Sequence, residues 1–225
     1  METNAAMPPR SGLKVAPRGG RDYIARHGET VFNAAGRLQG EHIHTPLTRA
    51  GFAQADEMGR ALREKLGAKP ALTLWASPTG RALQTLGIIA EHLELDWHAA
   101  QTDSRLVEIG MGRWGGAYYA ALAEAGEKVI DRDLGLLFPA PDGERYPEIA
   151  ARVSGWLADT DHDATDRLVI MHGISSRVLR GVMTGAPDIP GYGAPAAPGL
   201  PQGSVVLIER GVERIVHRGT GHAPA

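Results

Sequence analysis

The stretch YIARHGETVFN, residues 23–33, decides the fold class of this chain. It begins with a short apolar run that gives way at once to charged residues and a glycine, which is typical of a buried strand ending in a loop. The run LVIM at 168–171 ends in the same way, in His172 and Gly173. In open α/β sheets, ligands bind beyond the carboxyl ends of the strands. We therefore expect the functional residues directly after such runs.

Strands and helices alternate along the chain, which predicts an α/β protein with a mostly parallel central sheet and helices on both faces, a three-layer sandwich. The helix expected over 47–66 begins at the capping residue Thr48 and has apolar residues three or four positions apart. That apolar face consists of Phe52, Ala55, Met58, Leu62 and Leu66. The other expected helices are 80–93, 146–157 and 174–184, and the other expected strands are 72–76, a short one at 106–107, 204–209 and 212–217.

Length and composition favour a single globular domain. The chain has 225 residues, of which 43% are hydrophobic and 22% are charged, enough to bury one core. We expect a disordered tail at 1–20, one domain at 21–218 and a short tail at 219–225. Within the domain, the proline- and glycine-rich stretch 186–201 excludes regular structure, and Arg210-Gly211 is expected to form a tight turn.

Composition also excludes several classes of function. Cysteine is absent, so disulfide scaffolds and thiolate metal sites are ruled out. The net charge of −2 argues against a nucleic-acid partner bound by bulk charge. No apolar run approaches the roughly 18 residues that span a membrane, and the N-terminal segment contains no secretory apolar block. We therefore expect a soluble cytoplasmic protein with no membrane partner.

The residues that follow the strands have the chemistry needed to handle a phosphoryl group. They are Arg26, His27, Arg81, Glu108 and His172. Two guanidinium groups can bind one phosphoryl group through paired hydrogen bonds. A neutral imidazole is a nucleophile at neutral pH, and a carboxylic acid can protonate a leaving oxygen. These cations neutralise phosphate without a metal, so no cofactor is expected. Gly28, which lacks a side chain, is expected to let phosphate approach the backbone.

The motifs around these residues resemble those of the histidine phosphatase superfamily, also called the phosphoglycerate-mutase-like family. The first is Arg26-His27-Gly28-Glu29-Thr30 with Asn33, continued by GRLQG at 36–40 and PLT at 46–48 with Gly51. The others are SPxxR at 77–81 with AxQT at 82–85, LxE at 106–108 with Gly112 and Trp114, and VIMHG at 169–173. The blocks occur in the order of the family, from about residue 23 to residue 210. The resemblance implies a phosphoglycerate-mutase-like fold.

The resemblance also implies a role for each matching residue. His27 would be the nucleophile that forms a phosphohistidine, and Glu108 would act first as general acid and then as the base that activates water. The residues that would hold the phosphoryl group are Arg26, Arg81, His172 and, near it, Asn33. Arg37 would either line the substrate side or be structural. The family works without a metal, so the resemblance implies none here.

Three segments depart from the family pattern or carry a second interpretation. The loop 41–45 is longer by one residue than in many relatives, and its His42 and His44 indicate an altered substrate mouth, an incidental metal site or, as we favour, a surface loop. The stretch GMGRWG at 110–115 matches GxGxxG, but Trp114 stands where pyrophosphate would approach, which favours a turn that positions Glu108. Glu144 matches a Gly-Glu-Ser element, which implies substrate binding or orientation of an active-site group, although an acidic helix start explains it equally well.

Within this family, a phosphatase fits the sequence better than a mutase. Mutases usually follow the acid with a longer segment of the Glu-Arg-His-Tyr-Gly type, whereas Glu108 is followed by IGMGRWGG at 109–116. The segment from Glu108 to His172 is also short, which favours a small cap and entry of water. We therefore expect hydrolysis of a small-molecule phosphomonoester. A cofactor-dependent phosphoglycerate mutase is the alternative, and an inactive phosphate-binding module is the least favoured. The strands at 204–217 could pair two subunits in a homodimer.

Overall fold

The computed structural model describes residues 18–221, and its central feature is a six-stranded sheet with the order β3-β2-β6-β1-β7-β8. The strands are β1 (Asp22–Arg26), β2 (Leu72–Ala76), β3 (Gln101–Thr102), β6 (Asp166–Met171), β7 (Val205–Glu209) and β8 (Val212–His217). The pairs β1–β6, β2–β6 and β2–β3 are parallel, whereas β1–β7 and β7–β8 are antiparallel. The prediction of a mostly parallel central sheet is confirmed.

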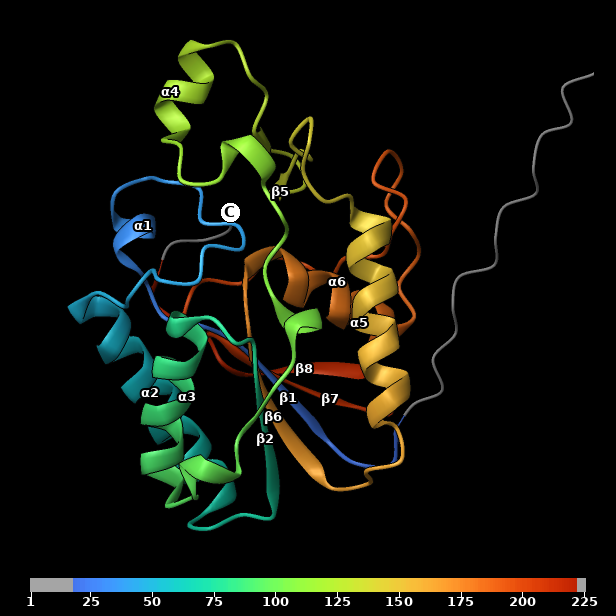
Figure 1. Ribbon diagram of the computed structural model, residues 1–225. Coiled ribbons are helices and arrows are strands. Elements are labelled where there is room, and N and C mark those ends of the chain that lie inside the picture. Colours follow the sequence, from blue (N-terminus) through green and yellow to red (C-terminus); the bar gives the residue numbers. More distant parts are fainter. Residues whose placement is uncertain (1–17, 222–225) are drawn as a thin grey trace, which may run out of the picture.

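Two helices cover each face of this sheet (Figure 1). The helices α2 (Arg49–Leu66) and α3 (Gly80–Leu93) lie on one face, and α5 (Tyr146–Thr160) and α6 (Gly173–Thr184) lie on the other. Successive side chains of a strand point to opposite faces, so Tyr23 and Ala25 of β1 enter the core under α2 and α3 while Ile24 enters the core under α5 and α6. The expected three layers follow from this alternation.

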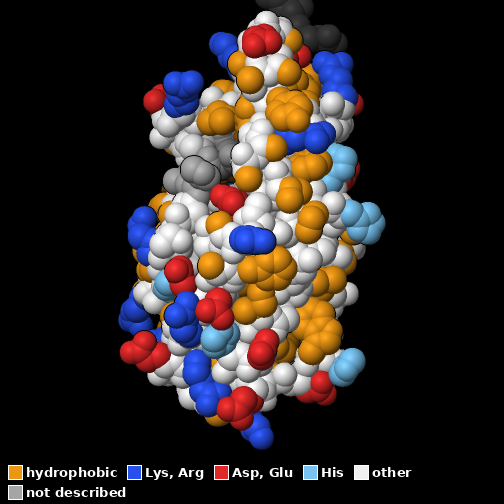
Figure 2. All heavy atoms as spheres, turned by 90° about the vertical axis from the view of Figure 1, so that its left-hand side faces the viewer, with side chains coloured by type: hydrophobic (Ala, Val, Ile, Leu, Met, Phe, Trp, Pro, Cys, Tyr) orange, Lys and Arg blue, Asp and Glu red, His pale blue; other side chains and the backbone are white. Residues whose placement is uncertain are grey.

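The helix α2 begins as predicted, but one residue of its expected core face is at the surface. The Thr48 side chain accepts a hydrogen bond from the Gly51 backbone nitrogen at 3.1 Å, which caps the helix. Ala55, Met58 and Leu62 are fully buried, whereas Phe52 is 45% exposed. Phe52 lies in the first turn of the helix. Figure 2 looks at this side of the molecule and shows hydrophobic side chains dispersed among charged ones.

Short elements cover the carboxyl ends of the parallel strands (Figure 1). They are α1 (Val31–Ala34), α4 (Tyr119–Glu124), β4 (Ile130–Asp131) and β5 (Leu136–Leu137), with the single turns η2 (Ser104–Leu106) and η3 (Gly112–Trp114) on the same side. A further single turn, η1 (Trp97–Ala99), packs against α3. The strand expected at 106–107 is therefore wrong. Asp103 accepts a hydrogen bond from the Arg105 backbone nitrogen and caps a 3₁₀ turn there, and the actual strand lies earlier, at β3.

The connections follow the expected turn chemistry. Arg210 and Gly211 both have positive φ, 49° and 77°, which is the geometry of a two-residue hairpin turn between β7 and β8. The stretch 186–201 contains no helix or strand, only an isolated bridge between Asp188 and Pro195. None of the helices within residues 18–221 has the length and apolar character needed to cross a membrane.

The ends of the described chain are packed where tails were expected. Residues 1–17 and 222–225 of the predicted tails lie outside the described residues. Arg18 is buried and forms an ion pair with Asp22 at 3.0 Å. At the other end, the Gly219 backbone nitrogen donates to Ser204 Oγ at 2.9 Å. The packed part of the chain therefore extends a few residues beyond the expected boundaries of 21 and 218.

Candidate active site

Adjacent parallel strands bring the predicted histidines together. β1 and β6 are neighbours, with Arg26 opposite Met171, and the His27 backbone nitrogen donates to the Met171 carbonyl at 3.0 Å. The residue after each strand is a histidine, so the rings of His27 and His172 lie 5.2 Å apart between centroids. β2 is the other parallel neighbour of β6, and α3 follows it with Arg81 in the first turn. The sheet register thus gathers residues that are far apart in the sequence.

One cavity at this edge is lined by most of the predicted site residues. Those residues are Arg26, His27, Asn33, Arg37, Arg81 and Glu108. His172 is fully buried beside the cavity and contacts Arg81. Gly28 and Glu144 are absent from the lining. The structure therefore brings together every predicted catalytic residue and all of the predicted binding residues except Gly28 and Glu144.

The His27 ring is held in one neutral tautomer. Its Nδ1 lies 2.6 Å from the carbonyl oxygen of Gly28, which can only accept, so Nδ1 carries the hydrogen and Nε2 keeps its lone pair. Burial, followed by the charges of Arg81 and Arg26, lowers the pKa of His27 well below 6.5. A neutral imidazole with a free Nε2 is the form that can attack phosphorus.

The His172 ring is held in the opposite sense. Arg81 Nε donates to His172 Nδ1 at 3.2 Å, and since a guanidinium only donates, the proton of neutral His172 is on Nε2. Burial and the nearby charge of Arg81 lower the pKa of His172 well below 6.5. Its buried Nε2 has no partner among the described residues. His172 is therefore set to donate one hydrogen bond to a ligand.

Arg81 is fixed by the loop that wraps around it. Its Nη1 donates to the His42 carbonyl at 2.6 Å and to Thr45 Oγ1 at 2.9 Å, and its Nη2 donates to the Gly40 carbonyl at 2.8 Å. Burial lowers the pKa of Arg81 to about 10. The side chain is therefore still a cation at neutral pH, and it needs no rearrangement to act as one.

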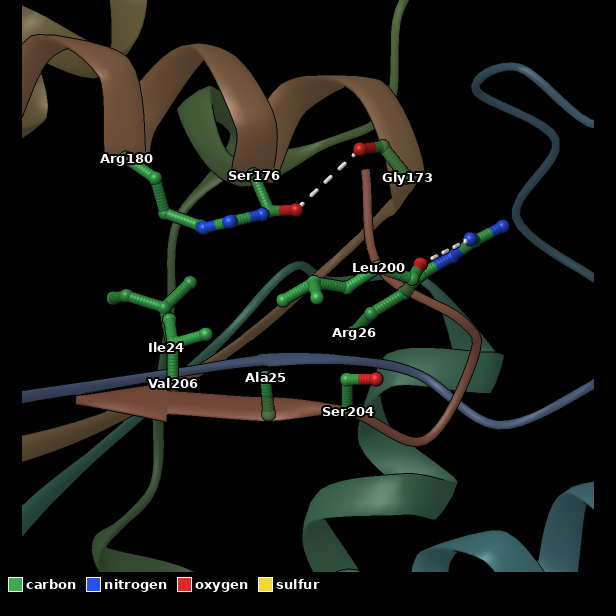
Figure 3. Close-up of a pocket in the computed structure, with 9 residues that line it drawn as sticks. All are labelled: Ile24, Ala25, Arg26, Gly173, Ser176, Arg180, Leu200, Ser204 and Val206. Atoms are coloured by element: carbon green, nitrogen blue, oxygen red, sulfur yellow. Dashed lines mark hydrogen bonds between the residues drawn. The ribbon is translucent and has the colours of Figure 1, made fainter. Parts of the chain in front are cut away.

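Arg26 is buried, and a backbone carbonyl group holds one end of its guanidinium group. Its Nη1 donates to the Leu200 carbonyl at 2.9 Å, and its buried Nε has no partner among the described residues. Figure 3 shows the space behind it, where Ser176 Oγ donates to the Gly173 carbonyl and the Arg26 guanidinium points away from Ile24. This space has a volume of only about 10 Å³, which at most admits one water. A substrate must therefore meet Arg26 from the side of the His27 cavity.

Glu108 caps the helix that follows the second histidine. Its carboxylate accepts hydrogen bonds from the backbone nitrogens of Ile174 and Ser175, at 3.1 and 2.9 Å, and from its own neighbour Ile109 at 3.0 Å. The first turn of α6 thus fixes the carboxyl group at the cavity wall through the free N–H groups of the helix start.

Two predicted binding residues have other places in the structure. A Cβ on Gly28 would lie 2.3 Å from the carbonyl oxygen of Gly51. Close packing against the start of α2 therefore requires this glycine, in place of the expected approach of phosphate. Glu144 points at Arg152, which donates to both of its carboxylate oxygens at 2.6 and 3.0 Å. An ion-paired carboxylate outside the cavity cannot contact the phosphoryl group.

The remaining predicted residues combine binding and support. The Asn33 side-chain oxygen accepts from the Thr30 backbone nitrogen at 3.0 Å, which completes the capping box of α1, so its amide nitrogen is the group that can donate to a ligand. Arg37 lines the cavity, and its Nε donates to the Gly116 carbonyl at 2.7 Å while its guanidinium lies 4.3 Å from the Phe32 ring centre. Arg37 therefore has structural contacts and also lies at the wall of the cavity.

Two polar residues of the cavity lining were missed by the sequence reasoning. Gln39 accepts hydrogen bonds from Thr30 and Thr45, each at 2.8 Å, and so connects the α1 cap to the loop around Arg81. Tyr119, at the start of α4, contributes a phenol whose pKa is raised by burial. The GRLQG motif contained Gln39, but nothing in the sequence indicated that Tyr119 would turn toward the cavity.

The loop 41–45 forms a second, larger cavity of about 530 Å³ next to the first. Its walls include His42, His44 and Glu41, together with apolar contacts from Phe32 and Met111. Within residues 18–221 no three side chains of the metal-binding types gather closely enough to hold an ion. Within that part of the chain, His42 and His44 therefore lack a third side chain that could complete a metal site. The cavity instead favours the interpretation of this loop as an altered substrate mouth.

Fold and cavity together define an α/β enzyme fold with a buried cavity, lined by cationic side chains, at the carboxyl edge of its sheet. The sequence model of the histidine phosphatase superfamily (branch 1) matches residues 23–215. This match covers most of the chain, and the chain belongs to that superfamily.

Individual relatives include both mutases and phosphatases. The chain is 33% identical over 172 residues to "Probable phosphoglycerate mutase GpmB" of Enterobacter sp. (strain 638), which covers 73% of this chain and 75% of that protein. It is 30% identical over 166 residues to the 6-phosphofructo-2-kinase/fructose-2,6-bisphosphatase of Caenorhabditis elegans, covering 72% of this chain and 33% of that protein. A solved mycobacterial glucosyl-3-phosphoglycerate phosphatase with VO3 has a TM-score of 0.68 at 21% identity, over 90% of this chain and 100% of that chain. This last likeness concerns the fold alone.

Proposed function

We propose that the chain hydrolyses a phosphomonoester through a phosphohistidine on His27, without a metal. The observation that carries the proposal is the tautomer of His27, whose Nδ1–H is held by the Gly28 carbonyl at 2.6 Å. This leaves Nε2 as a buried nucleophile facing a cavity that also contains Arg26 and Arg81. Positioned cations of this kind stabilise the charge on the equatorial oxygens of a phosphoryl group in transfer.

In the first step, His27 Nε2 forms a bond to phosphorus and the bond from phosphorus to the ester oxygen breaks. The leaving oxygen takes a proton from Glu108, so that a neutral alcohol departs. The Nε2–H of His172 donates to a phosphoryl oxygen throughout, since Arg81 holds that tautomer.

In the second step, water attacks phosphorus and gives a proton to the Glu108 carboxylate. The bond from phosphorus to Nε2 breaks, its electron pair returns to the ring, and His27 is again neutral. The three backbone N–H groups that bind the Glu108 carboxyl group support this role because they fix its position at the cavity wall. Inorganic phosphate is then the second product.

The alternative is a cofactor-dependent phosphoglycerate mutase, and the similarity to GpmB supports it. A mutase must return the phosphoryl group to a substrate and keep water out. The cover over the cavity is small, consisting of the six-residue helix α4 and the two-residue strands β4 and β5. A small cover supports hydrolysis, because water reaches the phosphohistidine easily.

The test is phosphate release from a panel of phosphomonoesters in EDTA, including p-nitrophenyl phosphate and 3-phosphoglycerate, with His27→Ala as the blank. Formation of 2-phosphoglycerate is measured in the same samples. Phosphate release that survives chelation and vanishes in the variant is the expected result. Interconversion of the two phosphoglycerates with little phosphate release would make the protein a mutase.

A further inference from the structure

The segment that carries Glu108 has no strand to hold it. Glu108 lies between the single turns η2 and η3, and its neighbours Val107 and Ile109 belong to no helix or strand. Its carboxylate nevertheless has to stay within hydrogen-bond reach of the ester oxygen and the attacking water, where a shift of about 1 Å can cost about 10²-fold in rate. Something outside the segment must therefore fix it.

Arg152 of α5 contacts this segment at two backbone positions. Its Nη1 donates to the carbonyl oxygen of Arg105, and its Nη2 lies 3.4 Å from the carbonyl oxygen of Glu108 itself. The first contact is within η2, and the second is with the backbone of Glu108 itself. Arg152 thus ties the segment to a helix that is packed in the core.

Glu144 completes the attachment from the other side. Its carboxylate pairs with Arg152 through two hydrogen bonds and also accepts from the Gly110 backbone nitrogen at 3.1 Å. The Glu144 backbone nitrogen donates to the Gly110 carbonyl at 2.7 Å. One bidentate ion pair therefore holds the backbone both at Glu108 and two residues after it.

The pair is well placed to act through Glu108 and poorly placed to act on the substrate. The Arg152 and Glu144 side chains are 16% and 20% exposed, so their pairing is screened less than that of a surface ion pair. Neither residue lines the cavity. A two-pronged guanidinium–carboxylate pair also fixes orientation, which a single ammonium cannot do.

We infer that Arg152 and Glu144 are positioning residues for Glu108, the group that gives the proton to the leaving oxygen and takes one from water. The inference rests on the proposed phosphomonoester hydrolysis. Breaking the pair then impairs proton transfer selectively and leaves nucleophilic attack by His27 in place. A leaving group that needs a proton, such as an alkyl alcohol, suffers more than p-nitrophenolate, which leaves readily without one.

The test compares Arg152→Met and Glu144→Gln with a matched control, Arg180→Met. Arg180 forms a similar bidentate pair with Glu213, with side chains 4% and 21% exposed, but on the far part of α6. Turnover of an alkyl phosphate is expected to fall about 10–100-fold in both test variants, while formation of the phosphoenzyme from p-nitrophenyl phosphate, measured as the burst of p-nitrophenolate in rapid mixing, slows by less than about threefold. In the Glu108→Gln background, Arg152→Met is expected to add little, because both changes act on one group. Arg180→Met leaves the ratio of the two rates unchanged.

A second readout does not depend on activity. The backbone amides of Ile174 and Ser175 donate to the Glu108 carboxylate, so their NMR signals report its position. Arg152→Met, Glu144→Gln and Glu108→Gln are expected to move both signals, and Arg180→Met is not. Equal losses on the two substrates, with unmoved Ile174 and Ser175 signals, would overturn the inference. A wild-type protein that releases no phosphate from any substrate would instead reject the proposed function, and the amide signals would still decide the positioning role.

Discussion

The site has two halves that are built in different ways. His27 and His172 directly follow neighbouring strands of one sheet, and backbone hydrogen bonds of the sheet fix their places. Arg81 lies in the first turn of the helix after β2 and is held by three contacts to the loop at 40–45. Glu108 lies on an irregular segment that is held by side chains, namely its own contacts to the start of α6 and the pair of Arg152 and Glu144. The difference indicates that the half that binds and attacks phosphorus is rigid with the core, whereas the half that moves protons depends on a few polar contacts.

The largest effect is expected from breaking the strand-end half. His27→Ala removes the nucleophile, and phosphate release should fall by about 10⁴-fold or more for every substrate, whatever its leaving group. Steady-state assays with p-nitrophenyl phosphate and an alkyl phosphate measure this, and circular dichroism checks that the fold is intact. A variant that keeps a tenth of the wild-type rate would show that His27 is not the nucleophile.

Breaking the other half should give a loss that depends on the leaving group. Glu108→Gln keeps the shape of the side chain but cannot give or take the proton, so turnover of an alkyl phosphate should fall about 10²–10⁴-fold. Formation of the phosphoenzyme from p-nitrophenyl phosphate should be much less affected, which a burst of p-nitrophenolate in rapid mixing would reveal. If the burst phase slows as much as alkyl phosphate turnover, Glu108 is not the acid.

The sequence was a good guide to the first half and a poor one to the second. Apolar runs followed by His27 and His172 predicted buried strands ending in functional residues, because a parallel sheet places all carboxyl ends at one edge. The segment at 106–107 was expected to be a strand, since its apolar residues do not distinguish a strand from a 3₁₀ turn. Arg152, the ion-pair partner of Glu144, lies eight residues later in the sequence. No sequence pattern distinguishes it from an arginine at the surface.

Gly28 gives a further example of what sequence reasoning could not find. Its flexibility and its place beside His27 predicted an approach of phosphate. The reason for the glycine is instead a contact with Gly51, 23 positions later, and such long-range packing leaves no local signal. The same limit applies to Phe52, whose spacing fits the buried face of α2 although its side chain is exposed.

The packing of Gly28 makes a third prediction, on the stability of the strand-end half. Gly28→Ala forces a methyl group toward the Gly51 carbonyl and should lower the free energy of unfolding by about 1–3 kcal/mol. Gly19→Ala is the matched control, because nothing lies within 4 Å of a Cβ at Gly19. Chemical denaturation measures both. A Gly28→Ala protein of unchanged stability that no longer binds phosphate would restore the interpretation that phosphate approaches this backbone.

The fourth prediction concerns pH and is the smallest in effect. Burial lowers the pKa of His27 and His172 well below 6.5, so below about pH 6.5 the unfolded chain binds more protons than the folded one. The free energy of unfolding should therefore fall as the pH is lowered from about 6.5, by at most about 1.4 kcal/mol per pH unit for each histidine. Denaturation curves at several pH values should show a shallower fall in His27→Asn and His172→Asn. If the free energy of unfolding depends on pH identically in all three proteins, the two buried histidines are not held in the neutral form.

The most direct test of the central claim is to trap the phosphoenzyme. The Glu108→Gln protein is mixed with p-nitrophenyl phosphate, quenched in alkaline detergent to preserve phosphohistidine, and digested for mass spectrometry, with His27→Ala in parallel. The account predicts a phosphoryl group on the peptide that contains His27, accumulated because water is no longer activated, and none in the His27→Ala sample. Turnover by the wild type without any phosphorylated His27, or a phosphoryl group on another residue, would contradict it.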